Sequence, residues 1–182
     1  MGYSSKIERS ITMESQRDSS PVLEVAHKAE LLYEAAGKIA ARNLVLSCLD
    51  FDSVLAGVQS GDELTRRKSL SLLEFWDAGR AAAELVRVLR FDPCPIVRHE
   101  AAYFLATLKR AETVAPLIEA LLNDGNELVR HEAAEALGDM GATTAISALE
   151  QVVLKDASEV VVRTARISIQ QLSFIRQRLP PA

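Results

Sequence analysis

Apolar residues return every three or four positions through most of the chain, which is the spacing that gathers them on one face of an α-helix. Two clear examples are the segments 113–122 (TVAPLIEALL) and 128–140 (LVRHEAAEALGDM). In the second, Ala133 and Leu137 belong to the apolar stripe. The pattern predicts an outer helix, a short turn at 123–127 and an inner helix, each helix three or four turns long.

The chain repeats itself at an offset of 32 residues. The sequence VRHEAA occurs at 97–102 and again at 129–134. An aspartate recurs at the same spacing, at Asp92, Asp124 and Asp156. Neither helix of such a unit can cover its apolar stripe alone, so we expect the units to stack side by side as a solenoid.

Two further units flank these. The positions 32 residues before His99-Glu100 hold Arg67-Lys68 instead of a His-Glu pair. Counted forwards with one inserted residue, Val162-Arg163 falls on the Val-Arg dipeptide, and Thr164-Ala165 replaces His-Glu. The sequence therefore predicts four repeats, of which the first and the fourth keep the scaffold without the pair.

These elements predict an all-α fold, an α-solenoid of about four helix pairs at residues 52–178. Residues 21–51 form an N-terminal helical cap in this prediction, because they have a helical apolar pattern but no Val-Arg signature. A subunit interface is the alternative role for this segment. Residues 1–20 are polar, of mixed charge and without an apolar stretch, which indicates a flexible tail rather than a signal peptide.

Local signals set the expected helix ends in the third repeat. Thr113 is a candidate N-cap, and Pro116 falls in the first turn, where no internal N–H bond is lost. Gly138 and Gly141 are expected to end the inner helix.

Composition narrows the function classes. A formal net charge of -4 disfavours nucleic-acid binding, which needs a basic face. The two cysteines, Cys48 and Cys94, lack the spacing of a disulfide framework or a zinc ribbon, so a reducing, cytoplasmic setting is the simplest expectation. No run of 18 apolar residues predicts a membrane span.

Two arginines in the repeats are predicted to be structural. Arg98 follows Asp92 by six residues, and Arg130 follows Asp124 by the same interval, so each pair can bridge the turn between two helices. Tyr103, beside the first His-Glu pair, is expected to pack rather than to line a pocket.

The His-Glu pairs are the candidate site. Stacked inner helices lie about 8 to 10 Å apart, so His99 and His131 can converge, with Glu100 and Glu132 beside them. Imidazole and carboxylate together suit iron, manganese or zinc. A single pair would be better explained as solvent-exposed and without specific function, but two identical pairs in adjacent repeats favour metal binding. His27 stands apart and is expected to be a surface or packing residue.

The two stretches IVRHEAAYFLATL and LVRHEAAEALGDMGA resemble HEAT repeats, and in particular one half of deoxyhypusine hydroxylase, over about residues 52–172. The repeats are also similar to those of phycobilin lyases. The hydroxylase is a di-iron enzyme with four His-Glu pairs, two in each half, that hydroxylates a modified lysine on a translation factor.

The resemblance implies that His99, Glu100, His131 and Glu132 are iron ligands and that dioxygen chemistry follows. This chain has two pairs instead of four, so a homodimer is expected to supply the other two and to share a di-iron site between its chains. The substrate does not carry over, and a protein partner or protein substrate is expected. The alternative is a non-catalytic HEAT adaptor or a chromophore-lyase type of subunit that binds a protein on its concave face.

Overall fold

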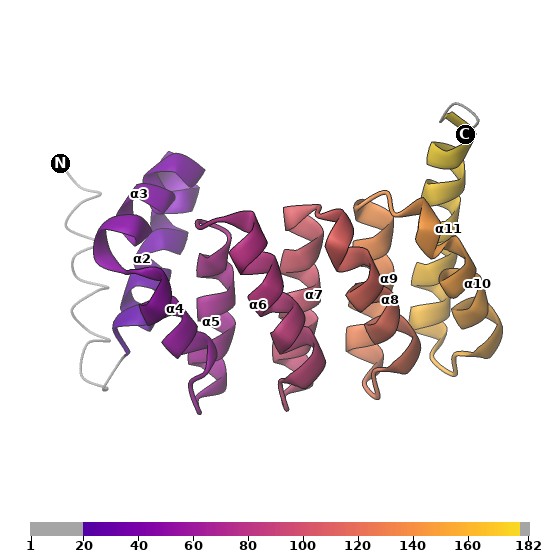
Figure 1. Ribbon diagram of the computed structural model, residues 1–182, viewed down its shortest axis with the longest axis horizontal. Coiled ribbons are helices and arrows are strands. Elements are labelled where there is room, and N and C mark those ends of the chain that lie inside the picture. The colour runs from indigo at the N-terminus through magenta and orange to yellow at the C-terminus, as the bar shows by residue number, and fades with distance from the viewer. Residues whose placement is uncertain (1–19, 179–182) are drawn as a thin grey trace. The chain divides into compact units, whose positions relative to one another are not determined.

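The computed structural model describes residues 20–178, and this part of the chain is helical, with no β-strand in it (Figure 1). The all-α prediction is confirmed, and the four predicted helix pairs are present in the described range. Of the predicted N-terminal tail, residues 1–19 lie outside the described residues. The chain divides into two compact units between Phe75 and Trp76.

The first unit contains the predicted cap and the first helix pair. Its helices are α2 (Pro21–Ala36), α3 (Lys38–Cys48), α4 (Phe51–Val58) and α5 (Glu63–Leu73). Helix α2 packs against both α3 and α5. Aspartates start the last two helices, because the Asp50 carboxylate accepts a hydrogen bond from the Ser53 backbone N–H at 2.8 Å and that of Asp62 from the Thr65 N–H at 2.7 Å.

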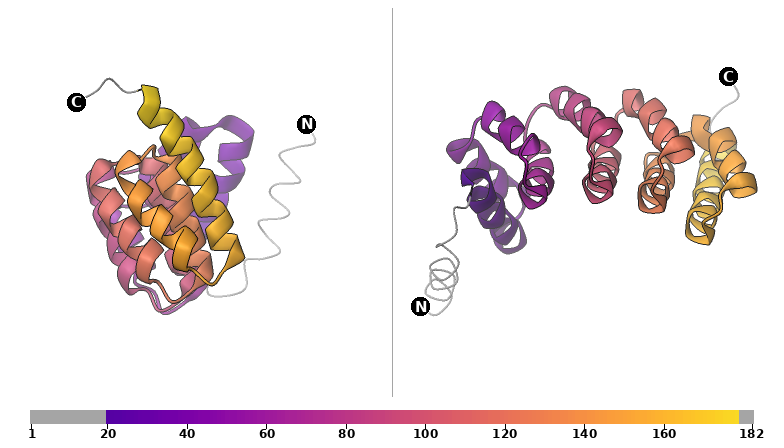
Figure 2. Two further views of the ribbon diagram at one scale, coloured as in Figure 1. Left: turned by 90° about the vertical axis from the view of Figure 1, so that its right-hand side faces the viewer. Right: turned by 90° about the horizontal axis from the view of Figure 1, so that it is seen from below.

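The second unit stacks three helix pairs in two layers. Its helices are α6 (Ala78–Phe91), α7 (Pro95–Leu108), α8 (Val114–Asn123), α9 (Glu127–Asp139), α10 (Ile146–Lys155) and α11 (Glu159–Arg178). The inner helices α7, α9 and α11 contact one another in order, as do the outer helices α6, α8 and α10 (Figures 1 and 2). The apolar stripes of the inner helices are buried, with Leu105, Leu137 and Leu172 fully so.

The 32-residue register holds through the fourth repeat. The inner helices begin at Pro95, Glu127 and Glu159, at a constant spacing. Val161, not Val162, takes the fully buried position. The predicted insertion is therefore wrong, and Arg163-Thr164 stands where the third repeat has its His-Glu pair. The sequence was misleading because Val162-Arg163 copies the Val-Arg dipeptide one residue out of register.

Arginines link the second repeat to the third and the third to the fourth. The Arg98 guanidinium donates to both carboxylate oxygens of Asp124 at 2.8 and 2.9 Å, and to the backbone carbonyl of Asp92 at 2.8 Å. Arg130 binds the Asp156 carboxylate in the same way, at 2.7 and 3.0 Å. The predicted structural role is confirmed, but the predicted carboxylate partner is wrong, since each arginine pairs with the aspartate of the following repeat.

The predicted cap at Thr113 is wrong in its chemistry. Thr113 does occupy the N-cap position of α8, but its hydroxyl donates to the Arg110 carbonyl at 2.8 Å instead of accepting from the helix. Pro116 lies in the first turn of α8, as predicted.

The two glycines of the third repeat have different roles. Gly141 follows α9 with a φ of +69°, a conformation that glycine adopts without strain, so its predicted part in ending the helix is confirmed. Gly138 instead lies inside α9, where a Cβ would come within 3.0 Å of the Ser168 Cβ. Its small size lets α11 approach closely enough for the Ser168 hydroxyl to donate to the Ala134 carbonyl at 2.8 Å.

Both cysteines are free thiols, Cys48 exposed and Cys94 partly buried. Within residues 20–178 no helix combines the length and the apolar character that a bilayer crossing requires.

Candidate metal centre

Each inner helix of the second unit buries one side and leaves the opposite side open. In α7, Val97, Ala101 and Leu105 are fully buried, whereas Ile96 and Tyr103 are exposed. We call the exposed side of α7, α9 and α11 the inner face. The four predicted ligands lie along its edges: His99, Glu100 and His131 are partly buried and Glu132 is buried.

Neighbouring inner helices are joined by side chains from the His-Glu positions. Successive residues on a helix point about 100° apart, so the histidine faces the next repeat and the glutamate faces the previous one. His99 Nε2 lies 3.0 Å from Glu132 Oε2 between α7 and α9. Between α9 and α11, His131 Nδ1 lies 2.8 Å from Thr164 Oγ1. The contact between the two pairs is therefore one of His99 with Glu132, and the predicted convergence of His99 with His131 stays a prediction.

Thr164 fixes the orientation of the His131 ring. The Thr164 hydroxyl donates its single proton to the Val160 backbone carbonyl at 3.1 Å, so toward His131 it accepts. Nδ1 of His131 therefore carries a proton and donates it to Thr164. In the neutral ring this leaves the lone pair on Nε2, the atom on the opposite side from Thr164.

A third acidic side chain completes a group around His131. His131, Glu132 and Glu135 each offer a ligand atom within 4.8 Å of the others, and they are the one such group of three or more His, Cys, Asp or Glu side chains in the described residues. His131 Nε2 lies 3.6 Å from Glu135 Oε2. Sequence reasoning missed Glu135, although its spacing gave a signal, since residues four apart share a helix face.

The donor set of this group suits a metal ion. The Nε2 atom of His131 faces a carboxylate oxygen of Glu135, and both are metal-ligand atoms. Two ligands about 2.1 Å from one ion are roughly 3 to 3.5 Å apart, close to the 3.6 Å between these atoms. One imidazole and two carboxylates match iron, manganese and zinc.

The remaining predicted residues lie outside this group. Glu100 is partly buried on α7. Tyr103 was expected to pack, but half of its surface is exposed, and its ring meets the Phe104 ring edge-on with 5.2 Å between the centroids. His27 is an exposed residue of α2, in agreement with its predicted surface position.

Residues 82–170, which include all of this geometry, match the family model described as HEAT repeats. This stretch is a run of HEAT repeats. Among solved structures, the chain is similar to human deoxyhypusine hydroxylase in complex with glycerol, with 27% sequence identity and a TM-score of 0.61. The similarity covers 72% of this chain and 46% of the hydroxylase, so the chain corresponds to less than half of that enzyme. No curated protein sequence matches the chain.

Both resemblances inferred from the two VRHEAA stretches, to HEAT repeats and to the hydroxylase, are therefore confirmed. The two His-Glu pairs of this chain lie on adjacent inner helices, α7 and α9.

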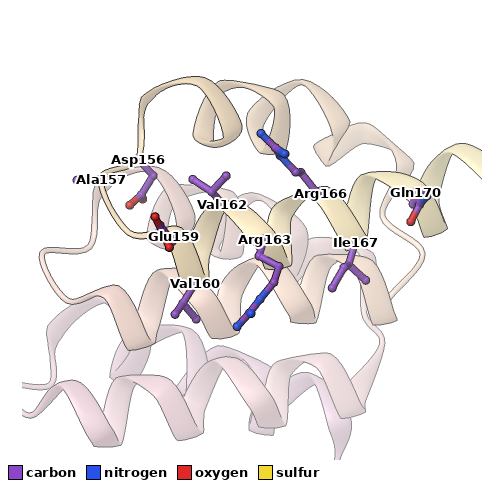
Figure 3. Close-up of a pocket in the computed structure, with 9 residues that line it drawn as sticks. All are labelled: Asp156, Ala157, Glu159, Val160, Val162, Arg163, Arg166, Ile167 and Gln170. Atoms are coloured by element: carbon purple, nitrogen blue, oxygen red, sulfur yellow. The ribbon is translucent and has the colours of Figure 1, made fainter.

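An apolar ladder runs along the same inner face. Each inner helix of the HEAT repeats exposes one branched aliphatic residue at its second position: Ile96 (41%), Leu128 (49%) and Val160 (43%). In Figure 3, Val160 points to the same side of α11 as Arg163 and Ile167, away from Val162 and Arg166. Side chains of this kind at one position per repeat form a surface that a protein partner can cover.

The depression drawn in Figure 3 lies on α11 and the loop before it. It is lined by Asp156, Ala157, Glu159, Val160, Val162, Arg163, Arg166, Ile167 and Gln170. The lining includes none of the predicted ligands, so the depression is a separate feature of the fourth HEAT repeat.

Proposed function

We propose that this chain is a metal-binding HEAT-repeat protein that holds iron through His99, Glu100, His131 and Glu132, in a di-iron site shared by two chains, and that it serves an O2-dependent hydroxylation. The observation that carries the proposal is the contact of His99 with Glu132 beside the group of His131, Glu132 and Glu135. The similarity to a hydroxylase supports the same reading. Manganese and zinc accept the same ligands, and metal analysis distinguishes them.

The residues around the site have separable tasks. Iron held by imidazole and carboxylate groups with open coordination positions supplies the activation of dioxygen. Thr164 holds the His131 ring so that Nε2 is available. His99 fixes the buried Glu132 carboxylate, which would otherwise lose water without gaining a partner. The exposed inner face gives a substrate access to these groups from one side.

A second copy of the chain is the partner that the proposal requires. Di-iron carboxylate sites draw ligands from several facing helices, and one chain provides two His-Glu pairs. A two-fold axis brings the same patch of both chains face to face, which supplies four pairs. The apolar ladder of Ile96, Leu128 and Val160 gives such a contact apolar side chains to bury.

The same ladder favours a second function of a different class. A HEAT adaptor binds another protein through the exposed side of its inner helices and needs no metal. In that case Ile96, Leu128 and Val160 are contact residues for a protein partner, and the His99–Glu132 pair is a structural link between repeats.

The deciding experiment measures metal content and molecular mass of the purified wild type and of the double variant His99→Ala/His131→Ala. His27→Ala is the matched control, because it removes the exposed histidine of α2. We expect iron in the wild type and in the control, a mass of twice the 19.9 kDa chain, and loss of iron in the double variant. A visible absorption band that changes on exposure to air would connect the iron with dioxygen chemistry.

A metal-free monomer whose mass and fold do not respond to the double substitution contradicts the proposal and favours the adaptor. Iron that stays bound in the double variant also contradicts it, because the ligands must then be other residues.

A further inference from the structure

The two His-Glu pairs are not equivalent within one chain. His131 has the carboxylate of Glu135 one helical turn away, with 3.6 Å between Nε2 and Oε2. At the same position of the second repeat, 32 residues earlier, stands Tyr103, whose ring is half exposed and contacts Phe104. His99 instead contacts the carboxylate of the following repeat, Glu132.

We infer that Glu135 is a further metal ligand, and that His131, Glu132 and Glu135 hold the first metal ion within a single chain; toward this first ion His99 acts through Glu132, and it becomes a ligand only in the two-chain site proposed above. This inference rests on the proposed metal binding. It adds one ligand, and it adds the order in which the metal positions are occupied. The position four residues after the histidine decides which pair binds without a partner chain.

The geometry gives each residue its role. His131 is held through Nδ1 by Thr164, so its other nitrogen faces the group. Glu132 is nine-tenths buried and its Oε2 lies 3.0 Å from His99 Nε2, so its carboxylate has little freedom to turn away. The Glu135 side chain is about half exposed, so it can swing toward a cation without disturbing the core. The two carboxylates of the group, Glu132 and Glu135, attract a divalent cation.

The fourth repeat cannot form such a site. At the positions of His131 and Glu135 it has Arg163 and Ile167, a cation and an apolar side chain, and Figure 3 draws both on one side of α11. The third repeat is therefore the place in the second unit where histidine and two carboxylates meet.

The test titrates Mn²⁺ into the metal-free full-length chain and counts bound ions by the loss of the free Mn²⁺ signal in electron paramagnetic resonance. We expect one tightly bound ion per chain in the wild type. Glu135→Gln should weaken this binding by about 10-fold or more, and His99→Ala by about 10-fold through its effect on Glu132. His131→Ala should abolish it. The matched control, Glu150→Gln, removes an exposed carboxylate of the outer helix α10 and should leave the affinity unchanged.

The variant Tyr103→Glu tests whether the second repeat can gain a metal site of its own. It places a carboxylate four residues after His99, on an exposed position that tolerates a polar side chain, and should raise the stoichiometry toward two ions per chain.

The possible failures are distinguishable. If His131→Ala loses the ion but Glu135→Gln binds it as tightly as the wild type, the inference is wrong and the proposed function stands. An unchanged stoichiometry in Tyr103→Glu also contradicts the importance of this position. If the wild type binds no ion, both the inference and the proposed function fail. Circular dichroism of each variant checks that the helices are intact.

Discussion

The second and third HEAT repeats have the same six-residue sequence VRHEAA, but their inner helices α7 and α9 place it in different surroundings. His99 meets the buried carboxylate of Glu132, whereas His131 meets the hydroxyl of Thr164 and has Glu135 beside it. The difference arises because each histidine faces the next repeat. In a stacked array, the chemistry of a motif is decided by its neighbour as much as by its own residues.

The buried interior is most alike in the second and third repeats. Leu105 and Leu137 are both completely buried at equivalent positions. Leu105→Ala and Leu137→Ala should each lower the free energy of unfolding by about 2 to 5 kcal/mol, from lost burial and the cavity left behind. Urea denaturation measures both. A cost below about 1 kcal/mol for either variant would show that the two cores are not equivalent.

The arginine links should also be alike in the two repeats. Arg98→Ala and Arg130→Ala each leave a mostly buried aspartate without its guanidinium, and we expect a loss of about 1 to 3 kcal/mol in either case. The control Arg90→Ala removes a more exposed pair with Glu119 and should cost under about 1 kcal/mol. Thermal unfolding compares the three variants, and a control as damaging as the other two would argue against the links.

Acid should weaken the same links. The hydrogen bond from Arg130 lowers the pKa of Asp156, and at Asp124 burial raises the pKa but the bonds from Arg98 and the Asn126 N–H lower it further. A carboxyl whose folded pKa is depressed stabilises the protein above its unfolded pKa of about 3.9, and this stability is lost as pH falls through the folded pKa.

We therefore expect the wild type to lose stability on going from pH 5 to pH 3, and the double variant Arg98→Ala/Arg130→Ala to lose less. Denaturation at the two pH values checks this difference. An equal loss in both proteins would assign the acid sensitivity to other carboxyls.

Substitutions at the ends of α7 and α9 should give the smallest changes in stability. Gly141 follows α9 in the left-handed region, and at the same position after α7 stands Lys109, with a φ of +49°. A side chain in that conformation is strained, so Lys109→Gly should stabilise the protein by about 0.5 to 1 kcal/mol. Gly141→Ala should destabilise it by a similar amount. A destabilising Lys109→Gly, measured by thermal unfolding, would mean that the lysine side chain contributes more than its backbone costs.

Much of the fold could be predicted from the sequence because helical periodicity and the 32-residue repeat are local signals. The inner helix predicted at 128–140 is observed as Glu127–Asp139. The register of the fourth repeat was harder to predict, because Val161 and Val162 are both apolar and burial alone separates them. The arginine partners were missed because the nearer aspartate in sequence is not the nearer carboxylate in space.

The candidate site was predicted in part. His131 and Glu132 do come together, and Glu132 also reaches His99, since equivalent positions of stacked helices are neighbours. Glu135 lies outside the shared VRHEAA sequence, at a position where the second repeat has Tyr103, so the repeat itself gives no signal for it. The role of Thr164 could not be predicted, because it depends on the register of α11.

The constant register of the arginine links means that the length of this array can change without redesign. A copy of residues 111–142 inserted after Ala142 would bring its own aspartate for the arginine before it and its own arginine for the aspartate after it. The same copy would add one more His-Glu-Glu group, with its glutamate facing the histidine that previously met Thr164. In such a duplication the number of His-Glu-Glu groups grows by one with each unit, while the two ends of the stack stay as they are.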